Sequence, residues 1–218
     1  KIAATVTSLM RLTDEKKIDI DSTLGTYLPS LDTSNKDGMV IREILSHQAR
    51  LKPWIPFWLE TMEQVVWNKK RKRFDIQNSK YKDGVYDGKA TKNHPVKVTA
   101  NLWIGENYKD SIFKQIIASP LEEKSEYLYS DLGYYLIKEI IDSITGIPLE
   151  NYCRDNFYKP LGLKTMGYLP LNYYPKDKII PTEDDYYFRR SLVQGTVHDP
   201  GAAMLGGVSG HAGLFSNS

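Results

Sequence analysis

Several side chains in this sequence can take part in acid–base chemistry, and Lys1 and Tyr129 are the most informative of them. A lysine amine can act as a base toward a serine hydroxyl where its surroundings favour the neutral form, and a tyrosine hydroxyl can relay the proton. Both residues also have a structural interpretation. A terminal lysine is usually a solvated charge, and Tyr129 followed by Ser130 and Asp131 suits an aromatic ring packed before a helix cap. Residue type alone leaves both interpretations open.

The histidines and the cysteine give little support to metal or thiol chemistry. His198-Asp199 and His211 lack the tight spacing of metal ligands, so hydrogen-bonded loop histidines are the favoured interpretation. The single cysteine, Cys153, excludes an internal disulfide and a four-thiolate site, and its helical neighbours favour a core thiol. We expect neither a metal nor a cofactor.

The composition is that of an ordinary folded domain. Of the 218 residues, 41% are hydrophobic and 26% are charged, with a net charge of +2, so no global field selects nucleic acid or an anionic membrane. The basic run at 69–73 could bind nucleic acid, but without a basic surround a solvated face is favoured. We expect no nucleic-acid partner, and no apolar run is long enough to cross a membrane.

Hydrophobic periodicity predicts the elements that would position Lys1 and Tyr129. An apolar stripe predicts a helix over residues 2–13, and a second short helix is predicted over 40–46, ending at His47. Ser22 is expected to cap a brief helix that ends at Pro29, after a short extended piece at 18–21. The clearest helix begins after Tyr129 and stops at Gly146, and the next runs from Pro148 to about Phe157.

The segment at about 60–115 is less regular and is predicted to be an insertion. It is expected to carry a small hairpin, a half-buried strand over 96–102 and a helix around 108–118. After Leu163 the sequence is rich in Pro, Tyr and Gly and shows little periodicity, which predicts a long ordered loop region.

Three strings, in this order, resemble the β-lactamase-related serine hydrolases. Residues 1–21 resemble the helix that follows a Ser-x-x-Lys motif, and 24–47 resemble the next segment, which ends in a Leu-x-His turn. Tyr129-Ser130-Asp131 resembles the Tyr-x-Asn element. Residues 206–216, Gly-Gly-Val-Ser-Gly-His-Ala-Gly-Leu-Phe-Ser, resemble a glycine-rich turn. The resemblance covers nearly the whole chain apart from the insertion.

The resemblance implies catalytic roles for Lys1, as the motif lysine, and for Tyr129. The nucleophilic serine would lie three positions before Lys1, and the family works through an acyl-enzyme. Asp131 and His198 are implied as substrate-binding residues, His198 because the loop at 195–200 adjoins the glycine-rich turn. The expected substrate is a β-lactam, a cell-wall peptide or an ester.

The sequence departs from the family pattern at several points. Asp131 stands where Asn is commoner, which replaces an amide donor by an acceptor, and residues 48–50 replace a Ser-Gly turn. His211-Ala212-Gly213 has the letters of the last family motif, but we expect the true one beyond Ser218. The internal Ser111-x-x-Lys114 lies only 18 residues before Tyr129 and is rejected as a chance match.

The resemblance implies an α+β fold class: the mainly helical portion of a β-lactamase/transpeptidase-like fold with a few short strands, its core antiparallel sheet largely outside 1–218. We expect residues 1–218 to be the central part of one such domain, truncated at both ends and inactive by itself. The parent protein is expected to be bacterial and periplasmic or exported, and in one subgroup the domain is fused behind a family 3 glycoside hydrolase. The alternative is a non-catalytic member that binds peptidoglycan or a partner protein.

Overall fold

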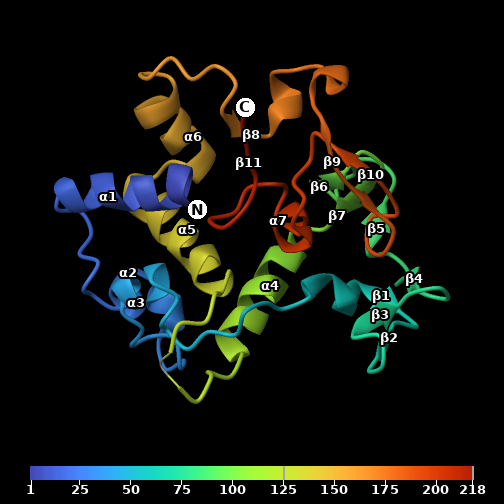
Figure 1. Cartoon of the computed structure of the whole chain (residues 1–218), viewed down its shortest axis with the longest axis horizontal. Coiled ribbons are helices and arrows are strands. Elements are labelled where there is room, and N and C mark those ends of the chain that lie inside the picture. Colours follow the sequence, from blue (N-terminus) through green and yellow to red (C-terminus); the bar gives the residue numbers. More distant parts are fainter. Residues whose placement is uncertain (125, 218) are drawn as a thin grey trace. The chain divides into compact units, whose positions relative to one another are not determined.

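The computed structural model describes residues 1–124 and 126–217 (Figure 1). The chain forms two compact units, each built from segments that are distant in the sequence. Unit 1 comprises Lys1–Ile55, Phe113–Tyr168 and Val208–Ser218, and unit 2 comprises Pro56–Ile112 and Leu169–Gly207. Residues 60–112 of the predicted insertion fold together with residues 169–207 in unit 2, and residues 113–115 belong to unit 1.

Unit 1 is mainly helical. Its only paired strands among the described residues are β8 and β11, which run antiparallel. The elements are a π-helix Ile2–Val6, α1 Thr7–Asp14, α2 Leu24–Tyr27, a 3-10 turn Pro29–Leu31, α3 Ile41–Leu45, the second half of α4 Asn107–Ala118, α5 Leu132–Thr145, α6 Leu149–Cys153, a π-helix Arg154–Tyr158, β8 Gly167–Tyr168 and β11 Leu214–Phe215.

Helix α5 forms the core of unit 1. Its apolar face is buried against α3, α6 and the first π-helix, and each fully buried Leu or Ile contributes about 1.5–3 kcal/mol. The helix ends at Gly146, whose φ of 67° is left-handed and suits glycine. The predicted helices at 2–13, 40–46, 108–118 and after Tyr129 are confirmed, and Cys153 is a buried core thiol as expected.

Two local predictions in unit 1 are wrong. The residue before α2 is Thr23, not Ser22, and no side chain caps the helix. Instead the Leu24 amide donates to the carbonyl of Met39 at 2.8 Å, so the backbone of a neighbouring segment satisfies it. Residues 18–21 form no strand, and the nearest pairing is an isolated bridge between Thr23 and Val40.

Unit 2 is built from short antiparallel strand pairs. They are β1 Met62–Glu63 with β4 Lys80–Tyr81, β2 Val66–Asn68 with β3 Arg73–Asp75, β9 Pro181–Asp185 with β10 Ser191–Gln194, and the three-stranded order β5 Tyr86–Asp87, β7 Leu102–Ile104, β6 Val96–Thr99. Helical turns at Phe57–Thr61, Pro170–Asn172 and Lys176–Lys178, the first half of α4 and α7 Pro200–Met204 complete it.

Two expectations for unit 2 are corrected. The single strand expected over 96–102 is a hairpin, because residues 100–101 form a turn and Thr99 pairs with Leu102. The region after Leu163, expected as loop, contains the β9–β10 hairpin. Strand β9 reads Pro-Thr-Glu-Asp-Asp, a composition that is depleted in strands. It forms because Glu183 and Asp185 pair with the buried Arg189, a contact that periodicity does not reveal.

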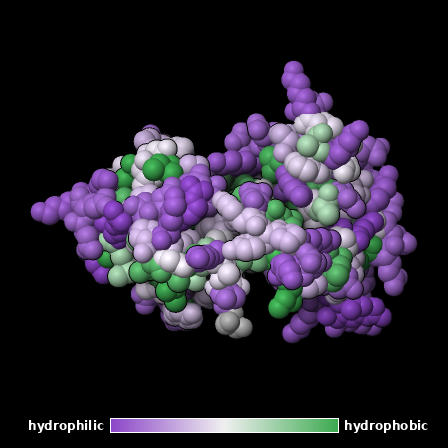
Figure 2. All heavy atoms as spheres, turned by 90° about the horizontal axis from the view of Figure 1, so that it is seen from above, coloured by the Kyte–Doolittle hydropathy of each residue, from purple (hydrophilic) through white to green (hydrophobic). Residues whose placement is uncertain are grey.

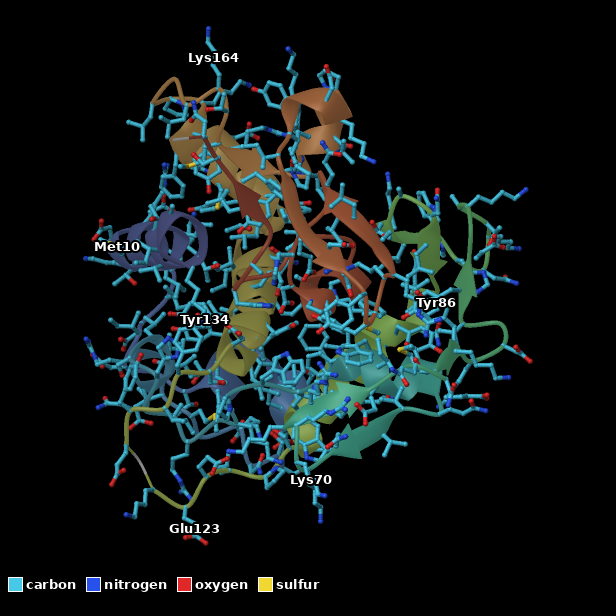
Figure 3. All side chains as sticks on the ribbon, turned by 45° about the vertical axis from the view of Figure 1, so that its right-hand side comes forward. Met10, Lys70, Tyr86, Glu123, Tyr134 and Lys164 are labelled. Carbon is cyan, nitrogen blue, oxygen red and sulfur yellow. The ribbon has the colours of Figure 1, made fainter. Side chains whose placement is uncertain are left out.

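Polar side chains cover much of the face shown in Figure 2. Figure 2 shows hydrophilic residues over most of the face in view, with hydrophobic atoms in small patches. The five residues of the basic run at 69–73 are all exposed around the β2–β3 hairpin, and Lys70 extends away from the ribbon in Figure 3. Both observations agree with a solvated basic face.

Candidate active site

Unit 1 brings Lys1 into one cluster with Tyr129 and Asp131, which lie 128 and 130 positions further along the sequence. The Lys1 Nζ lies 2.8 Å from Asp131 Oδ1 and 3.4 Å from the carbonyl oxygen of Ser130. It also lies over two aromatic faces, 3.6 Å from the ring centroid of Tyr129 and 4.7 Å from that of Tyr134. The lysine side chain is only 12% exposed, while Tyr129 is 51% exposed. The three residues that sequence analysis selected in this unit therefore share one partly open site.

The turn that carries Tyr129 is held by hydrogen bonds to two other segments. The Ser130 hydroxyl donates to the carbonyl of Lys52 at 2.6 Å and accepts from the Leu132 amide, the first residue of α5. The Ser130 amide donates to Nδ1 of His47 at 3.2 Å, and the Leu128 amide donates to the carbonyl of His47 at 2.9 Å. Ser130 thus supports the start of the helix, and the Asp131 carboxylate is left to face Lys1.

The helix that carries Lys1 is fixed by the interior of unit 1. The Thr5 hydroxyl donates to the carbonyl of Gly210 at 2.6 Å, and the Tyr158 hydroxyl donates to the carbonyl of Ala3 at 2.7 Å. A Cβ on Gly210 would lie 2.0 Å from the carbonyl oxygen of Tyr134, so only glycine allows this approach to α5. The glycine-rich turn therefore connects the Lys1 helix to the helix that follows Tyr129.

The Lys1 amine contacts one carboxylate and two aromatic rings. Asp131 is its ion-pair partner and the rings of Tyr129 and Tyr134 face it, whereas an asparagine at 131 would supply no charge. The Asp131 departure noted in the sequence therefore acts directly on Lys1. Burial raises the pKa of Tyr134 beneath the cluster, so that its hydroxyl stays neutral.

His198 lies in unit 2 and is described within that unit alone. Its carbonyl accepts from the buried Arg189 guanidinium at 2.6 Å, and its Nε2 lies 3.8 Å from a carboxylate oxygen of Glu183. The His198 side chain is largely exposed. Its expected contact with substrate stays a prediction.

His47 is the residue of this site to which sequence reasoning gave no role. The centroid of its ring lies 4.5 Å from the ring centroid of Tyr129 and 5.7 Å from that of Tyr134. The sequence could have singled out His47, because it ends the Leu-x-His turn. The sequence could not show that its Nδ1 accepts a hydrogen bond from the Ser130 amide. The internal match Ser111 is set differently, because its hydroxyl donates to the Glu60 carboxylate.

Two further classes of site were searched for in the described part of the chain. Over residues 1–124 and 126–217, no group of three His, Cys, Asp or Glu residues is arranged to hold a metal ion. Within the same residues, no helix has the length and apolar character needed to cross a membrane.

Relatives with similar sequences are named as an amidase and as carboxypeptidases. The N-acetylmuramyl-L-alanine amidase of Bacillus subtilis (strain 168) is 29% identical over 238 residues, covering 100% of this chain and 45% of the relative. A protein of Escherichia coli (strain K12), named "Putative D-alanyl-D-alanine carboxypeptidase", is 32% identical over 183 residues, covering 78% of this chain and 41% of the relative. The chain thus spans just under half the length of the curated relatives it matches.

Solved structures with a similar fold include a β-lactamase/D-alanine carboxypeptidase from Yersinia pestis and FmtA from Staphylococcus aureus. The Yersinia pestis structure has a TM-score of 0.55 and 18% sequence identity, and the match covers 99% of this chain and 48% of the solved chain. The FmtA structure has a TM-score of 0.55 and 16% sequence identity, and the match covers 98% of this chain and 46% of the solved chain. This likeness confirms the expected α+β fold class. A family model described as Beta-lactamase matches residues 2–218. The match runs from the first turn of the N-terminal helix through the glycine-rich turn. The chain therefore belongs to the Beta-lactamase family.

Proposed function

We propose that the protein containing this chain is a serine hydrolase that works through an acyl-enzyme on a D-alanyl cell-wall peptide or a β-lactam. One observation carries the proposal: Lys1, Tyr129 and Asp131 meet in a single partly buried cluster at the start of α5. The names of the relatives, an amidase and a carboxypeptidase, support the cell-wall substrate class.

In the proposed reaction a serine three positions before Lys1 attacks the substrate carbonyl. The serine proton passes to the Lys1 amine while the new C–O bond forms, and Tyr129 or Lys1 delivers a proton to the departing amine as the C–N bond breaks. Water then attacks the ester, with the same groups taking its proton and returning it to the serine oxygen. Each step therefore moves one proton through the cluster.

The roles of the remaining residues follow from their charges. Asp131 holds the Lys1 side chain in place, because its carboxylate is in contact with Nζ. Tyr129, half exposed, presents its ring to solvent and to the entering substrate. His198 is proposed as a substrate contact from the loop at 195–200.

Labelling of the intact protein by a fluorescent penicillin or a fluorophosphonate tests this proposal. We expect covalent label that is lost in the variant lacking the serine three positions before Lys1. Residues 1–218 expressed alone are expected to remain unlabelled, and label on this segment would mean that the nucleophile lies elsewhere. An intact, folded protein that takes no label from either probe would contradict the acyl-enzyme.

The second candidate is a non-catalytic member of the family that binds peptidoglycan or a partner protein. The ion pair between Lys1 and Asp131 favours it, since a held ammonium can bind a carboxylate without accepting a proton. Any residue other than serine three positions before Lys1, together with retained binding to purified peptidoglycan, would support this candidate.

We further propose that the protein works in the periplasm or is exported, as the cell-wall substrate class requires. Fractionation of cells with an antibody to the protein tests this, and a purely cytoplasmic signal would contradict it. A fused family 3 glycoside hydrolase domain in the parent chain stays a prediction, which its complete sequence tests directly.

A further inference from the structure

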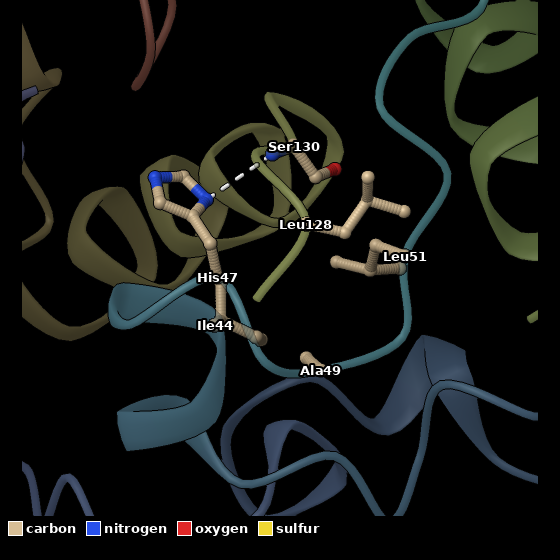
Figure 4. A pocket seen from close by; sticks show the side chains of 6 residues that line it. All are labelled: Ile44, His47, Ala49, Leu51, Leu128 and Ser130. Atoms are coloured by element: carbon tan, nitrogen blue, oxygen red, sulfur yellow. Dashed lines mark hydrogen bonds between the residues drawn. The ribbon is translucent and has the colours of Figure 1, made fainter. Parts of the chain in front are cut away.

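His47 holds the turn that carries Tyr129 from both sides. It follows α3 with a left-handed φ of 58°, which turns its side chain and its carbonyl toward the same segment. The carbonyl accepts from the amide before Tyr129, that of Leu128, and Nδ1 accepts from the amide after it, that of Ser130. Figure 4 shows the second bond beside a small pocket, which Ile44, Ala49, Leu51 and Leu128 also line. His47 therefore holds the backbone on both sides of Tyr129.

The imidazole and the Lys1 ammonium contact the same two aromatic rings. The His47 ring lies 4.5 Å from Tyr129 and 5.7 Å from Tyr134, and a third tyrosine, Tyr127, meets it edge-on at 5.9 Å. Lys1 lies over the rings of Tyr129 and Tyr134. Movement of the imidazole would therefore displace the ring on which the ammonium rests.

The bond to Ser130 exists only when Nδ1 carries no proton. A neutral imidazole protonated at Nε2 can accept at Nδ1, whereas an imidazolium is a donor at both nitrogens and would face the Ser130 N–H with another N–H. Burial, and next the Lys1 charge, lower the pKa of His47, and Asp131 opposes them. The hydrogen bond with the Ser130 backbone also opposes the lowering, and the rings of Tyr127, Tyr129 and Tyr134 contact the imidazole. The accepting form therefore persists into mildly acidic solution.

We propose that His47 is a positioning residue, which orders Tyr129 beneath Lys1 by accepting the Ser130 amide bond and releases the turn when its imidazole is protonated. The effect on catalysis rests on the proposed function. The ordering of the turn does not, because the hydrogen bonds and ring contacts belong to unit 1 itself.

Two substitutions separate the hydrogen bond from the packing. His47→Phe keeps a ring against the tyrosines and removes the acceptor. His47→Asn removes the ring but keeps an oxygen near the place of Nδ1, and asparagine tolerates the left-handed backbone. We expect faster exchange of the Ser130 amide hydrogen in His47→Phe, by about fivefold, which is the loss of one hydrogen bond. His47→Asn should exchange at close to the wild-type rate.

Activity and pH complete the test in the protein that contains this chain. Penicillin acylation should be slowed about tenfold in His47→Phe through kcat rather than KM, and much less in His47→Asn. In the wild type the protection of the Ser130 amide from exchange should fall below the pKa of His47, and this fall should be absent in His47→Asn. Imidazole nitrogen chemical shifts should report protonation at Nε2 alone at neutral pH.

The outcomes separate this inference from the proposed function. Unchanged Ser130 exchange in a folded His47→Phe, or a wild-type shift pattern with Nδ1 protonated, would overturn the positioning role whatever the activity. A wild-type protein that takes no penicillin contradicts the proposed function, while the exchange and shift measurements still decide the role of His47. If His47→Phe does not fold, a His47→Asn variant that loses Ser130 protection in acid as the wild type does would overturn the proposal.

Discussion

The two units each hold a cation beside carboxylates, and the two clusters differ in what surrounds them. In unit 1, Lys1 faces a single carboxylate, that of Asp131, and two tyrosine rings, and it stays 12% exposed. In unit 2, the Arg189 side chain is 0% exposed. It donates to Asp185 at 2.7 Å, to Glu183, and to two backbone carbonyls at 2.6 Å each.

The two clusters differ in whether their cation can exchange a proton. Arg189 is surrounded by acceptors, and a guanidinium does not lose its proton in a protein, so this cluster ties β9 to the loop at 195–200 and supports structure. Asp185 adds to it by accepting from the amides of Tyr187, Phe188 and Arg189. The Lys1 cluster is less enclosed, and its amine can give and take a proton. The buried cluster is thus suited to support the fold, and the more open Lys1 cluster is the one proposed as the active site.

The largest expected effect is on activity, from Lys1. Lys1→Met should lower kcat/KM for penicillin acylation about a thousandfold, because the proton acceptor is lost. Lys1→Arg is the matched control: it keeps a cation beside Asp131 but cannot accept the proton, so it should fold normally and be almost as inactive. Steady-state acylation rates and thermal unfolding measure both. Near wild-type activity in Lys1→Arg would reduce Lys1 to a binding cation.

The second effect is on stability, from Arg189. Arg189→Met should lower the free energy of unfolding by about 3–5 kcal/mol, because Asp185 is left buried without its partner. Denaturant unfolding measures it. Arg42→Met is the control, since Arg42 forms an exposed pair with Asp21, and a much smaller change is expected there. Equal losses of unfolding free energy in the two variants would show that the buried Arg189 contributes no more to stability than the exposed Arg42.

A third cation sharpens the comparison, because Lys36 is buried against neutral oxygens. Its Nζ donates to the carbonyl of Ser119 at 2.5 Å and to Asn35 Oδ1 at 2.7 Å, and burial lowers its pKa to about 8. Between pH 8 and the unfolded value of 10.5 the unfolded chain binds more protons, so stability rises with pH in this window, by at most about 3 kcal/mol.

Lys36→Met removes this titration. Unfolding free energies measured across the same pH window should rise in the wild type relative to Lys36→Met, whatever the constant offset between the two proteins. Parallel pH profiles would show that Lys36 keeps an ordinary proton affinity in the folded state.

The smallest expected effect comes from Asp131→Asn, which restores the commoner family residue. Loss of the carboxylate removes the ion pair with Lys1 Nζ but keeps the shape of the side chain, so kcat for penicillin acylation should fall by no more than about threefold. Steady-state acylation rates measure this. A loss of tenfold or more would show that the charge of Asp131 is needed to position Lys1.

The helices were predictable because their signals are local. The apolar face of α5 and its stop at Gly146 lie within one segment, and the family strings around Tyr129 named the residues of the cluster. The β9–β10 hairpin was missed because β9 is polar and pairs with a buried arginine. The turn at 100–101 was missed because alternation continues through it.

The sequence by itself determined the helix pattern, the residue types able to move a proton and the family resemblance that joined Lys1 to Tyr129. Tertiary structure decided that Asp131 would pair with Lys1, that Ser130 would support the start of α5 instead, and that His47 would bracket the tyrosine. The physical reason is the distance along the sequence over which each interaction acts. Periodicity and caps act over a few residues, whereas an ion pair between residues 1 and 131 forms only when packing of α5 and the glycine-rich turn brings them together.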